Sequence, residues 1–338
     1  MNVDRKLIGE SPAFMESMER VSRAALLSKP VLVIGERGTG KELAAERLHY
    51  LSARWDKTLV KLNCAAVAES LLETELFGHE AGAFTGATRR HLGRFERADG
   101  GSLFLDEMAS MSLRLQEKLL RVIEYGEFER VGGDDALQVD VRVIGAANVD
   151  LPQMAERGEF RADLLDRLSF DVITLPPLRY RKGDMPVLAE HFAMGMVKEL
   201  KRAYFQGFSE TAMEQLEEYS WPGNLRELKN VVERAVYQGT EDELIETLEF
   251  DPFASPYRPL AKSVATGDEE EETAAPVEIL PGPANFKEHI RQYESELLQA
   301  ALEQHRYNQR NTASALGLSY DQLRGYLRKY ELIGTPPG

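Results

Sequence analysis

The chain has 338 residues, of which 43% are hydrophobic, and its formal net charge is −15. Its apolar runs are too short to cross a bilayer, its first residues contain no signal-peptide core, and its single cysteine excludes an internal disulfide. We therefore predict a cytoplasmic protein without direct membrane insertion. The negative net charge by itself argues against binding to nucleic acid.

In the first half of the chain, short apolar runs alternate with helical patterns. The apolar runs are typical of buried parallel strands and cover residues 31–34, 59–62, 102–105 and 141–146. Amphipathic helices are predicted at residues 42–51 and 113–124. This alternation predicts a doubly wound α/β core, in which ligands bind at the C-terminal edge of a parallel sheet.

The first of these runs leads directly into GERGTGKE, a glycine-rich sequence that opens a helix. Backbone N–H groups in such a loop hold anionic oxygens, while Lys41 and the helix N-terminus add positive charge. The pattern predicts an ATP phosphate site made of Gly35, Glu36, Arg37, Gly38, Thr39, Gly40, Lys41 and Glu42. Because Glu42 replaces the usual serine or threonine, a ligand for Mg²⁺ must come from elsewhere.

The sequence GGSLFLDE carries two carboxylates to the end of another predicted strand. Asp106 is placed to hold Mg²⁺, directly or through water, and Glu107 is placed to orient and polarise the attacking water. An apolar run followed by two acidic residues is common on its own. Its position on the same predicted sheet as the phosphate loop makes a hydrolytic site the preferred interpretation.

Two asparagines, Asn63 and Asn148, end other strands of the predicted sheet. Each amide could point toward the γ-phosphate or the attacking water. Each could instead cap a turn, and spacing alone favours this second interpretation.

Three arginines are candidates for phosphate binding. Arg161 and Arg167 belong to FRADLLDRL, where a spacing of six would separate them by about 120° on one helix. Pairing with a nearby aspartate, at 163 or 166, is the alternative for both. Arg226 follows WPGN near the start of a predicted helix, where a cation opposes the helix dipole and thus hints at a ligand.

A loop with glycines on both sides of an aromatic residue follows the sequence LFGHE. Its members are Gly82, Ala83, Phe84, Thr85, Gly86 and Ala87. Small and glycine residues around Phe84 are unusual for a core element. They allow a mobile loop whose exposed ring contacts a partner.

The C-terminal end differs from the acidic body. Between residues 305 and 330 there are five basic residues against one acidic residue. Helical patterns at 308–316 and from Ser319 to about 330 are separated by Gly317, which predicts a helix-turn-helix preceded by a support helix at 286–304. The residues proposed to meet DNA bases or phosphates are Tyr320, Gln322, Arg324 and Arg328. A helical hairpin for protein contact is the alternative.

Together, GERGTGKE, ELFGHEAGAFTGA, GGSLFLDE, FRADLLDRL and WPGNLRELKN resemble the bacterial enhancer-binding activators of sigma-54 RNA polymerase, a group of AAA+ ATPases. The family's own phosphate loop also ends in GKE. The resemblance implies that Lys41 binds the β- and γ-phosphates, that Asp106 serves Mg²⁺, and that Glu107 activates water. It also implies that Asn63 switches Glu107, and that Asn148 and Arg226 act as the first and second sensors.

The resemblance further implies partners. Arg161 and Arg167 would reach the ATP of a neighbouring copy, which requires a homo-oligomeric ring, most simply a hexamer. Phe84 and Thr85 would touch sigma-54, and the terminal module resembles the Fis-type helix-turn-helix that binds enhancer DNA. The phosphate loop begins at residue 35, which leaves no room for the N-terminal sensory domain of most members, so control by a negative regulator in trans is expected.

We predict four segments: an α/β ATPase subdomain at 1–174, a helical lid at 175–250, an acidic and proline-rich linker at 251–284, and a helix-turn-helix domain at 285–333. Trp55, between a predicted helix and strand, is a candidate anchor for the regulator, or else folds onto its own domain. Two other functions stay open: an AAA+ remodeller of other protein substrates, and a DNA-binding repressor that uses nucleotide only structurally.

Overall fold

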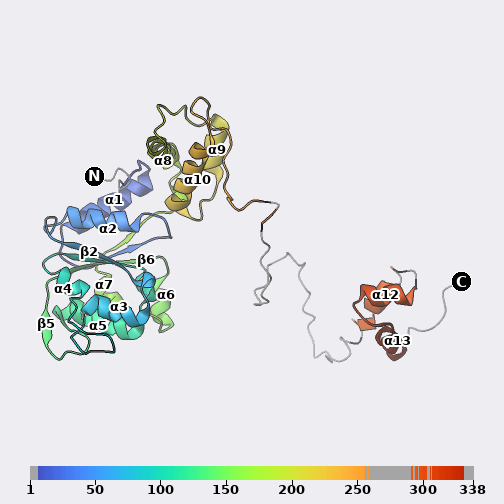
Figure 1. Ribbon diagram of the computed structural model, residues 1–338, viewed down its shortest axis with the longest axis horizontal. Helices are drawn as coiled ribbons and strands as arrows, with labels where there is room; N and C mark the ends of the chain where they lie inside the picture. The colour runs from blue at the N-terminus through green and yellow to red at the C-terminus, as the bar shows by residue number, and fades with distance from the viewer. Residues whose placement is uncertain are drawn as a thin grey trace. The chain divides into compact units, whose positions relative to one another are not determined.

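The computed structural model describes residues 7–255, 257–258, 291, 294–295, 297–302, 305 and 307–330. The chain forms two compact units, residues 1–258 and 259–338, which are considered separately (Figure 1). Most of the predicted linker lies outside the described residues, as does part of the predicted support helix. Among the described helices, none is long and apolar enough to cross a membrane.

The centre of the first unit is a five-stranded parallel sheet with the strand order β2-β3-β6-β1-β7. The strands are β1 Val31–Ile34, β2 Leu59–Asn63, β3 Ser102–Asp106, β6 Arg142–Ala147 and β7 Val172–Thr174. The predicted α/β class and its parallel sheet are confirmed. The edge strand β7 has only three residues, which is too short for a periodic signal in the sequence.

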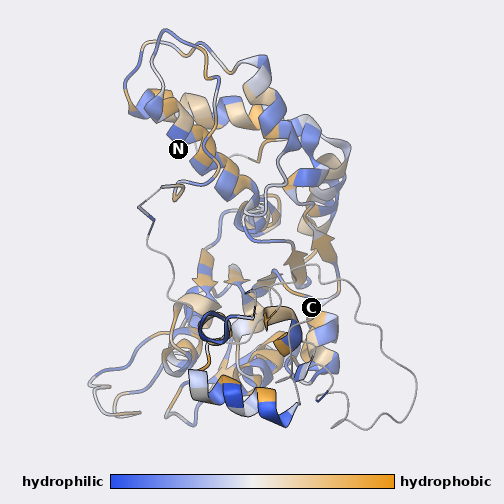
Figure 2. Cartoon of the chain, turned by 90° about the vertical axis from the view of Figure 1, so that its right-hand side faces the viewer, coloured by the Kyte–Doolittle hydropathy of each residue, from blue (hydrophilic) through white to orange (hydrophobic). Residues whose placement is uncertain are grey.

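Helices cover both faces of this sheet, because its strands are apolar on both sides. In β1, Val31 and Val33 pack into one core with α1 Pro12–Ala25 and α2 Lys41–Tyr50, whereas Leu32 packs into the other. The second core is built with α3 Glu69–Phe77, α4 Arg94–Arg97, α5 Leu113–Tyr125, α6 Leu151–Glu156 and α7 Ala162–Leu168. Figure 1 shows the two helical layers, and Figure 2 shows hydrophobic strands between helices of mixed hydropathy.

Short elements complete the α/β part. Three-residue 3₁₀ helices follow β2 and β3, namely η1 Cys64–Ala66 and η2 Met108–Ser110. An antiparallel pair, β4 Glu127–Glu129 and β5 Ala136–Gln138, follows α5. Two more 3₁₀ turns, η3 Leu178–Tyr180 and η4 Lys182–Asp184, lead into the helical part.

The helical part consists of α8 Met185–Glu199, α9 Glu210–Glu218 and α10 Asn224–Gln238. Its core surrounds Trp221, which is fully buried and donates its indole N–H to the carbonyl oxygen of Leu216 at 2.7 Å. Asp184 joins this part to the N-terminal segment. Its carboxylate accepts hydrogen bonds from the backbone N–H groups of Glu10 and Ser11 and from the guanidinium of Arg181, and both members of this ion pair are buried.

In the second unit, α12 Gln309–Ala315 and α13 Tyr320–Lys329 pack through a small core that includes Leu302, Ala313, Leu323 and Leu327. Gly317 has a φ of 63°, a left-handed conformation that ends the first helix. Ser319 and Gln322 form the capping box that the sequence predicted at the start of the second. The two helices of the predicted helix-turn-helix are therefore present.

A buried arginine fastens the helices of one face to the sheet. The Arg142 guanidinium, at the start of β6, donates to the carbonyl oxygens of Ala24 at 2.7 Å, Ala25 at 3.2 Å and Leu48 at 3.4 Å. These carbonyls lie near the C-terminal ends of α1 and α2, where the helix dipole favours a cation. Burial lowers the pKa of Arg142 to about 10. The side chain thus satisfies helix-end carbonyls that would otherwise be buried without a donor.

Replacing Arg142 with Ala should destabilise the α/β part, because the helix ends lose their donors and a cavity remains. A loss of about 3–5 kcal/mol is expected, which corresponds to a fall of roughly 6–20 °C in the thermal unfolding midpoint. Scanning calorimetry would measure this, with Arg114→Ala as the control. Arg114 is an exposed arginine in a surface ion pair, and its removal should shift the midpoint by less than about 2 °C. Equal shifts would show that Arg142 does not have this role.

Candidate functional site

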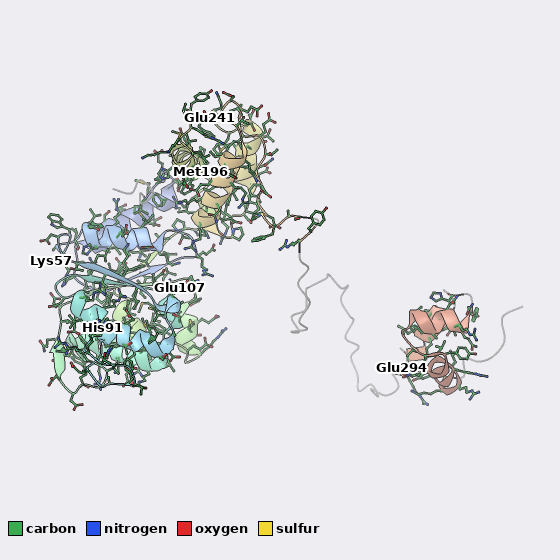
Figure 3. The ribbon with its side chains drawn as sticks, in the orientation of Figure 1. Lys57, His91, Glu107, Met196, Glu241 and Glu294 are labelled. Carbon is green, nitrogen blue, oxygen red and sulfur yellow. The ribbon has the colours of Figure 1, made fainter. Side chains whose placement is uncertain are left out.

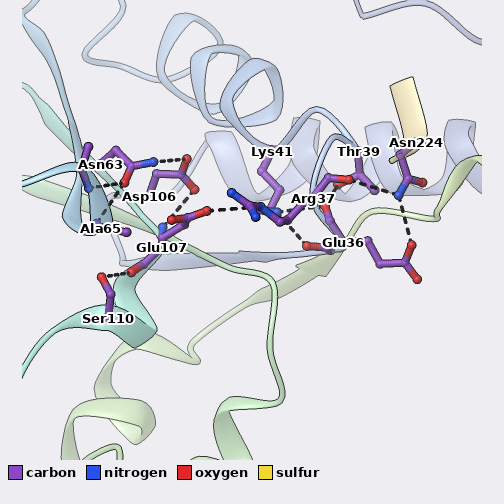
Figure 4. A network of polar contacts seen from close by, with 12 residues as sticks. Glu36, Arg37, Thr39, Lys41, Asn63, Ala65, Asp106, Glu107, Ser110 and Asn224 are labelled. Carbon is purple, nitrogen blue, oxygen red and sulfur yellow. Dashed lines mark hydrogen bonds and ion pairs between the residues drawn. The ribbon is translucent and has the colours of Figure 1, made fainter. Parts of the chain in front are cut away.

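The parallel register brings the polar residues predicted for the site to one edge of the sheet. Ile34 pairs with Ala147, and Asn63 pairs with Asp106. Gly35 and Asn148, which come directly after the first pair, consequently start their loops at the same edge. Figure 4 shows the phosphate loop facing Asn63, Asp106 and Glu107 across this edge.

The phosphate loop has the backbone that its glycines permit. Gly38 and Gly40 have φ angles of 79° and 96°, and a side chain at Gly38 would collide with the carbonyl oxygen of Gly223. The Lys41 ammonium donates to the carbonyl oxygens of Gly35 at 2.7 Å and Glu36 at 3.0 Å. Burial lowers the pKa of Lys41, against the opposing effect of the Asp106 and Glu107 carboxylates. The loop thus holds a buried cation, which suits a phosphate site, opposite two carboxylates.

Asn63 serves two purposes. Its side-chain oxygen accepts the backbone N–H groups of Ala65 at 2.9 Å and Ala66 at 3.1 Å, which is the turn-capping role. Its amide donates to Asp106 at 3.3 Å. Asn63 therefore contacts the carboxylate expected to serve Mg²⁺, whereas the resemblance implied Glu107 as the partner.

Glu107 instead pairs with the phosphate loop. Its carboxylate lies 3.8 Å from the Arg37 guanidinium. Its backbone is in the left-handed region, with a φ of 52°, which is uncommon for a residue other than glycine. Such strain is often found at functional sites, and here it turns the carboxylate toward the phosphate loop. Burial raises the pKa of the neighbouring Asp106, while a hydrogen bond from the Glu107 backbone and the charge of Lys41 oppose this.

Glu42 is bound by a lysine and is not free to act as a metal ligand. Its carboxylate accepts a hydrogen bond from Lys61 at 2.8 Å. The same lysine contacts Glu46, and these bonds raise the pKa of Lys61 despite its partial burial. Glu42 thus does not take over the task of the absent hydroxyl in this structure.

Two residues that the sequence analysis did not assign, Arg179 and Asn224, bind Glu36 of the phosphate loop. We call these three residues the Glu36 clamp. The Glu36 carboxylate accepts hydrogen bonds from Arg179 at 2.6 Å and 2.9 Å and from the Asn224 amide at 3.0 Å. The Asn224 amide also donates to the carbonyl oxygen of Arg37 at 3.1 Å. The hydrogen bonds from Arg179 and Asn224 lower the pKa of Glu36 to about 2. The clamp is consequently charged at neutral pH.

Asn224 is fully buried, and its side-chain oxygen accepts the backbone N–H of Leu178 at 2.8 Å. Its φ of 52° is one that asparagine tolerates well. The WPGN sequence was the available signal for it, but only the fold shows that this asparagine reaches the phosphate loop.

A hollow of about 390 Å³ lies between the phosphate loop and the helical part. It is lined on one side by Gly38, Gly40 and Glu42 and on the other by Leu225 and Arg226. Apolar lining residues that the sequence analysis missed are Leu7, Ile8, Leu188 and Phe192. Arg226 thus lines the same hollow as the glycines of the phosphate loop. Asn148 lines a second hollow of about 700 Å³ that also includes Gly35 and Glu36.

The two remaining arginines lie elsewhere. Arg161 pairs with Asp163 at 2.7 Å, one of its two predicted aspartate partners, and Arg167 pairs with Glu124 at 2.6 Å. Each lines a surface hollow, but neither hollow contains a residue of the phosphate loop. Within one copy of the chain, the structure therefore does not bring these two arginines to the site.

The loop 82–87 projects from a firm base. The N–H of Gly82 donates to the carbonyl oxygen of Ala87 at 2.7 Å, and Gly82 and Gly86 have φ angles of 85° and 105°. Ala87 is buried, whereas 43% of Phe84 is exposed. The adjoining Glu80 pairs with the buried Arg130 at 2.7 Å. The loop is thus closed at its base and presents an aromatic ring at its tip.

Trp55 is 64% exposed in the loop after α2. The backbone N–H of Trp55 donates to the carbonyl oxygen of Ser52 at 3.2 Å. The preceding Arg54 anchors the loop by donating to the carbonyl oxygens of Gly101 and Asp140. A fixed backbone therefore holds an exposed indole.

In the second unit, Tyr320, Arg324 and Arg328 are exposed on α13. The Gln322 side chain accepts the N–H of Ser319 at 2.9 Å as part of the capping box. Tyr320 donates to Gln309 on α12 at 3.4 Å.

The Glu36 clamp yields a prediction about nucleotide affinity. Glu36→Ala should weaken ATP binding by about three- to tenfold, because the helical part loses its charged anchor on the phosphate loop and the pairs involved are partly exposed. Glu36→Gln keeps neutral hydrogen bonds, so its affinity for ATP should lie between those of Glu36→Ala and the unchanged protein. Titration with a fluorescent ATP analogue would rank them, and Glu129→Ala, an exposed carboxylate on β4, should bind as the unchanged protein does. An affinity that is the same in all four proteins would contradict the clamp.

Three protein-family models match successive parts of the chain. Residues 7–174 match the model of the sigma-54 interaction domain, residues 179–259 that of the AAA+ ATPase lid domain, and residues 289–330 that of bacterial regulatory proteins of the Fis family. The Psp operon transcriptional activator of Escherichia coli K12 is 56% identical over 96% of this chain and 98% of its own length. The regulatory protein AtoC of the same organism is 43% identical over 96% of this chain and 67% of its own.

Solved structures agree. NtrX from Brucella abortus in complex with ATP superposes with a TM-score of 0.66 at 32% identity, and its complex with ADP with a TM-score of 0.67 at 31% identity. They cover 96% and 97% of this chain, and 69% of the NtrX chain in each case. The chain therefore belongs to the AAA+ ATPases that activate sigma-54-dependent transcription, and it carries a Fis-type helix-turn-helix.

Proposed function

We propose that this chain hydrolyses ATP between neighbouring copies of a hexameric ring and thereby remodels the closed complex of sigma-54 RNA polymerase in the cytoplasm. The observation that carries the proposal is the separation of the charged groups. Lys41, Asp106 and Glu107 meet at one sheet edge, whereas Arg161 and Arg167 lie on surfaces outside that site. A ring would bring the arginines of one copy to the phosphates held by the next.

Each residue then has a chemical task. Lys41 and the backbone N–H groups of the loop bind the β- and γ-phosphates. Glu107 orients the attacking water and accepts its proton, while Arg161 and Arg167 from the neighbouring copy stabilise the charge that develops on the transferred phosphoryl group, an effect that can reach about 10³–10⁵ in rate. Asn63, Asn148 and Arg226 report whether the γ-phosphate is present, since each lies on an element that borders the site.

Mg²⁺ fits this site with Asp106 as its protein ligand. In the described part of the chain no cluster of three or more His, Cys, Asp or Glu side chains could hold a metal by itself. Mg²⁺ commonly takes most of its ligands from phosphates and water and only one or two from carboxylates, which suits a single aspartate. When bound, the ion supplies positive charge to the β- and γ-phosphates.

The loop 82–87 is proposed as the contact with sigma-54, made by Phe84 and Thr85. The exposed Phe84 ring, on a loop closed by the hydrogen bond between Gly82 and Ala87, suits a contact that forms and dissociates repeatedly. The terminal helix-turn-helix is proposed to bind upstream enhancer DNA through Tyr320, Arg324 and Arg328, with Gln322 near the same helix end. Its basic residues imply DNA binding that weakens steeply as salt is added.

We further propose that the target is a phage-shock operon, which responds to envelope stress, and that a negative regulator acts on this chain in trans. Identity of 56% over nearly the whole length of the Psp operon activator supports this assignment. Trp55 would anchor the regulator, since its indole is exposed on a loop whose backbone is fixed.

Two substitutions separate the motor from its output. In transcription from a sigma-54 promoter with purified polymerase, Glu107→Gln should lower ATP turnover by about 100-fold or more while ATP still binds, because the water is no longer activated. Phe84→Ala should keep turnover but lose promoter opening. Promoter opening by Phe84→Ala at the original level would refute the proposed contact, and undiminished turnover by Glu107→Gln would refute the proposed base.

Trp55→Ala should relieve inhibition by the phage-shock negative regulator, because the anchoring ring is lost. The measurement is ATP turnover with increasing amounts of purified regulator. Tyr237→Ala is the matched control, since this aromatic residue on α10 is also 64% exposed and should leave inhibition unchanged. Inhibition of Trp55→Ala at the original regulator concentration would exclude the anchor.

A further inference from the structure

His79 lies between the end of α3 and the loop 82–87, and its backbone is held from two sides. Its N–H donates to the carbonyl oxygen of His91 at 3.1 Å, and the N–H of His91 donates back at 2.9 Å. The next residue, Glu80, donates its N–H to the carbonyl oxygen of Val131 at 3.1 Å. The position from which the imidazole projects is therefore fixed. Figure 3 labels His91 on the side of the sheet that carries α3 and α5.

The imidazole of His79 contacts two rings. Its centroid lies 5.0 Å from that of Phe84 in an edge-to-face arrangement, and 5.5 Å from that of His91 in a stacked one. Edge-to-face and offset-stacked pairs at these distances are favourable. Phe84 is thus supported on one side by His79, and 43% of its surface stays exposed.

One atom of this arrangement is unsatisfied. The Nδ1 atom of His79 is buried, and no group among the described residues forms a hydrogen bond with it. A buried polar atom without a partner costs free energy, so it calls for an explanation. An apolar ring in the same place would support Phe84 without that cost.

We propose that His79 is a positioning residue that seats the Phe84 ring against the body of the protein, and that its unpaired nitrogen keeps this seat weak enough to release. The seat is the packing of the Phe84 ring against the His79 imidazole, and it holds the loop 82–87 in one conformation. When Phe84 moves away, the Nδ1 atom of His79 becomes accessible to water. This inference rests on the proposed role of Phe84 as the sigma-54 contact. It adds that His79 sets the resting position of Phe84, and that the unpaired nitrogen of His79 weakens this packing.

The test compares the accessibility of Phe84 in the full chain without nucleotide. Chymotrypsin cleaves after exposed aromatic residues, so the initial rate of cleavage after Phe84 can be followed by mass spectrometry. Cleavage after Tyr257, which is 90% exposed, serves as the internal reference. His79→Ala removes the seat and should raise the relative rate by about two- to tenfold. His79→Phe keeps a ring and removes the unpaired nitrogen, so it should lower the rate by about fivefold.

Phe205→Ala is the matched control. Its ring forms an edge-to-face pair with Phe208 at 5.4 Å in the helical part, and its loss should leave the rate at Phe84 unchanged. The cleavage rate after Phe84 should be highest in His79→Ala, intermediate in the unchanged protein and lowest in His79→Phe. Any other order overturns the proposed seat. Unfolding midpoints of the variants show whether faster cleavage reflects global unfolding, and the slower cleavage of His79→Phe cannot arise that way.

Capture of purified sigma-54 with ATP and aluminium fluoride gives the second readout. A seat that releases less readily should make His79→Phe capture about fivefold less sigma-54, while His79→Ala captures at least as much as the unchanged protein. Full capture by His79→Phe would overturn the release part of the inference. Full capture by Phe84→Ala would instead overturn the proposed role of Phe84, and the cleavage rates would still decide whether the seat exists.

Discussion

The alignment of strand ends in a parallel sheet is the constraint on which the site depends. Because all the strands run in one direction, their C-terminal ends lie along one edge, and the loops that follow them carry the reactive groups. The pairing of Asn63 with Asp106 and of Ile34 with Ala147 fixes which groups meet. A shift of one residue in the register between β2 and β3 would turn Asn63 and Asp106 to opposite faces of the sheet. The buried Arg142, which ties the ends of α1 and α2 to β6, helps to hold this arrangement.

Charge organises the site once the edge is formed. Lys41 and Arg37 on the phosphate loop face Asp106 and Glu107 on the strand end. The carboxylate of Glu36, on the same loop, points the other way and is bound by Arg179 and Asn224. The phosphate loop is therefore connected on one side to the carboxylates of Asp106 and Glu107 and on the other to the lid. The same short loop thus contacts both the strand-end carboxylates and the lid.

Family membership settles the choice between the functions that the sequence left open. An AAA+ remodeller without a transcriptional role would not match the sigma-54 interaction domain, and a repressor without ATPase activity would not need the carboxylate pair. The loop 82–87 shows how such a motor can present a contact. Its base is closed by backbone hydrogen bonds, whereas its aromatic tip packs against His79, whose Nδ1 has no hydrogen-bond partner among the described residues.

The sequence by itself determined the elements whose signals are local. Apolar runs specified the central strands, glycine spacing specified the phosphate loop, and Gly317 with the Ser319 capping box specified the turn between the last two helices. Only the tertiary structure decided which partners these residues have. Asn63 contacts Asp106, Glu107 pairs with Arg37, and Asn224 reaches Glu36 from 188 positions away. Such contacts join residues that are distant in the sequence, so they depend on the tertiary fold. Neither hydrophobic periodicity nor a short motif predicts which distant residues meet.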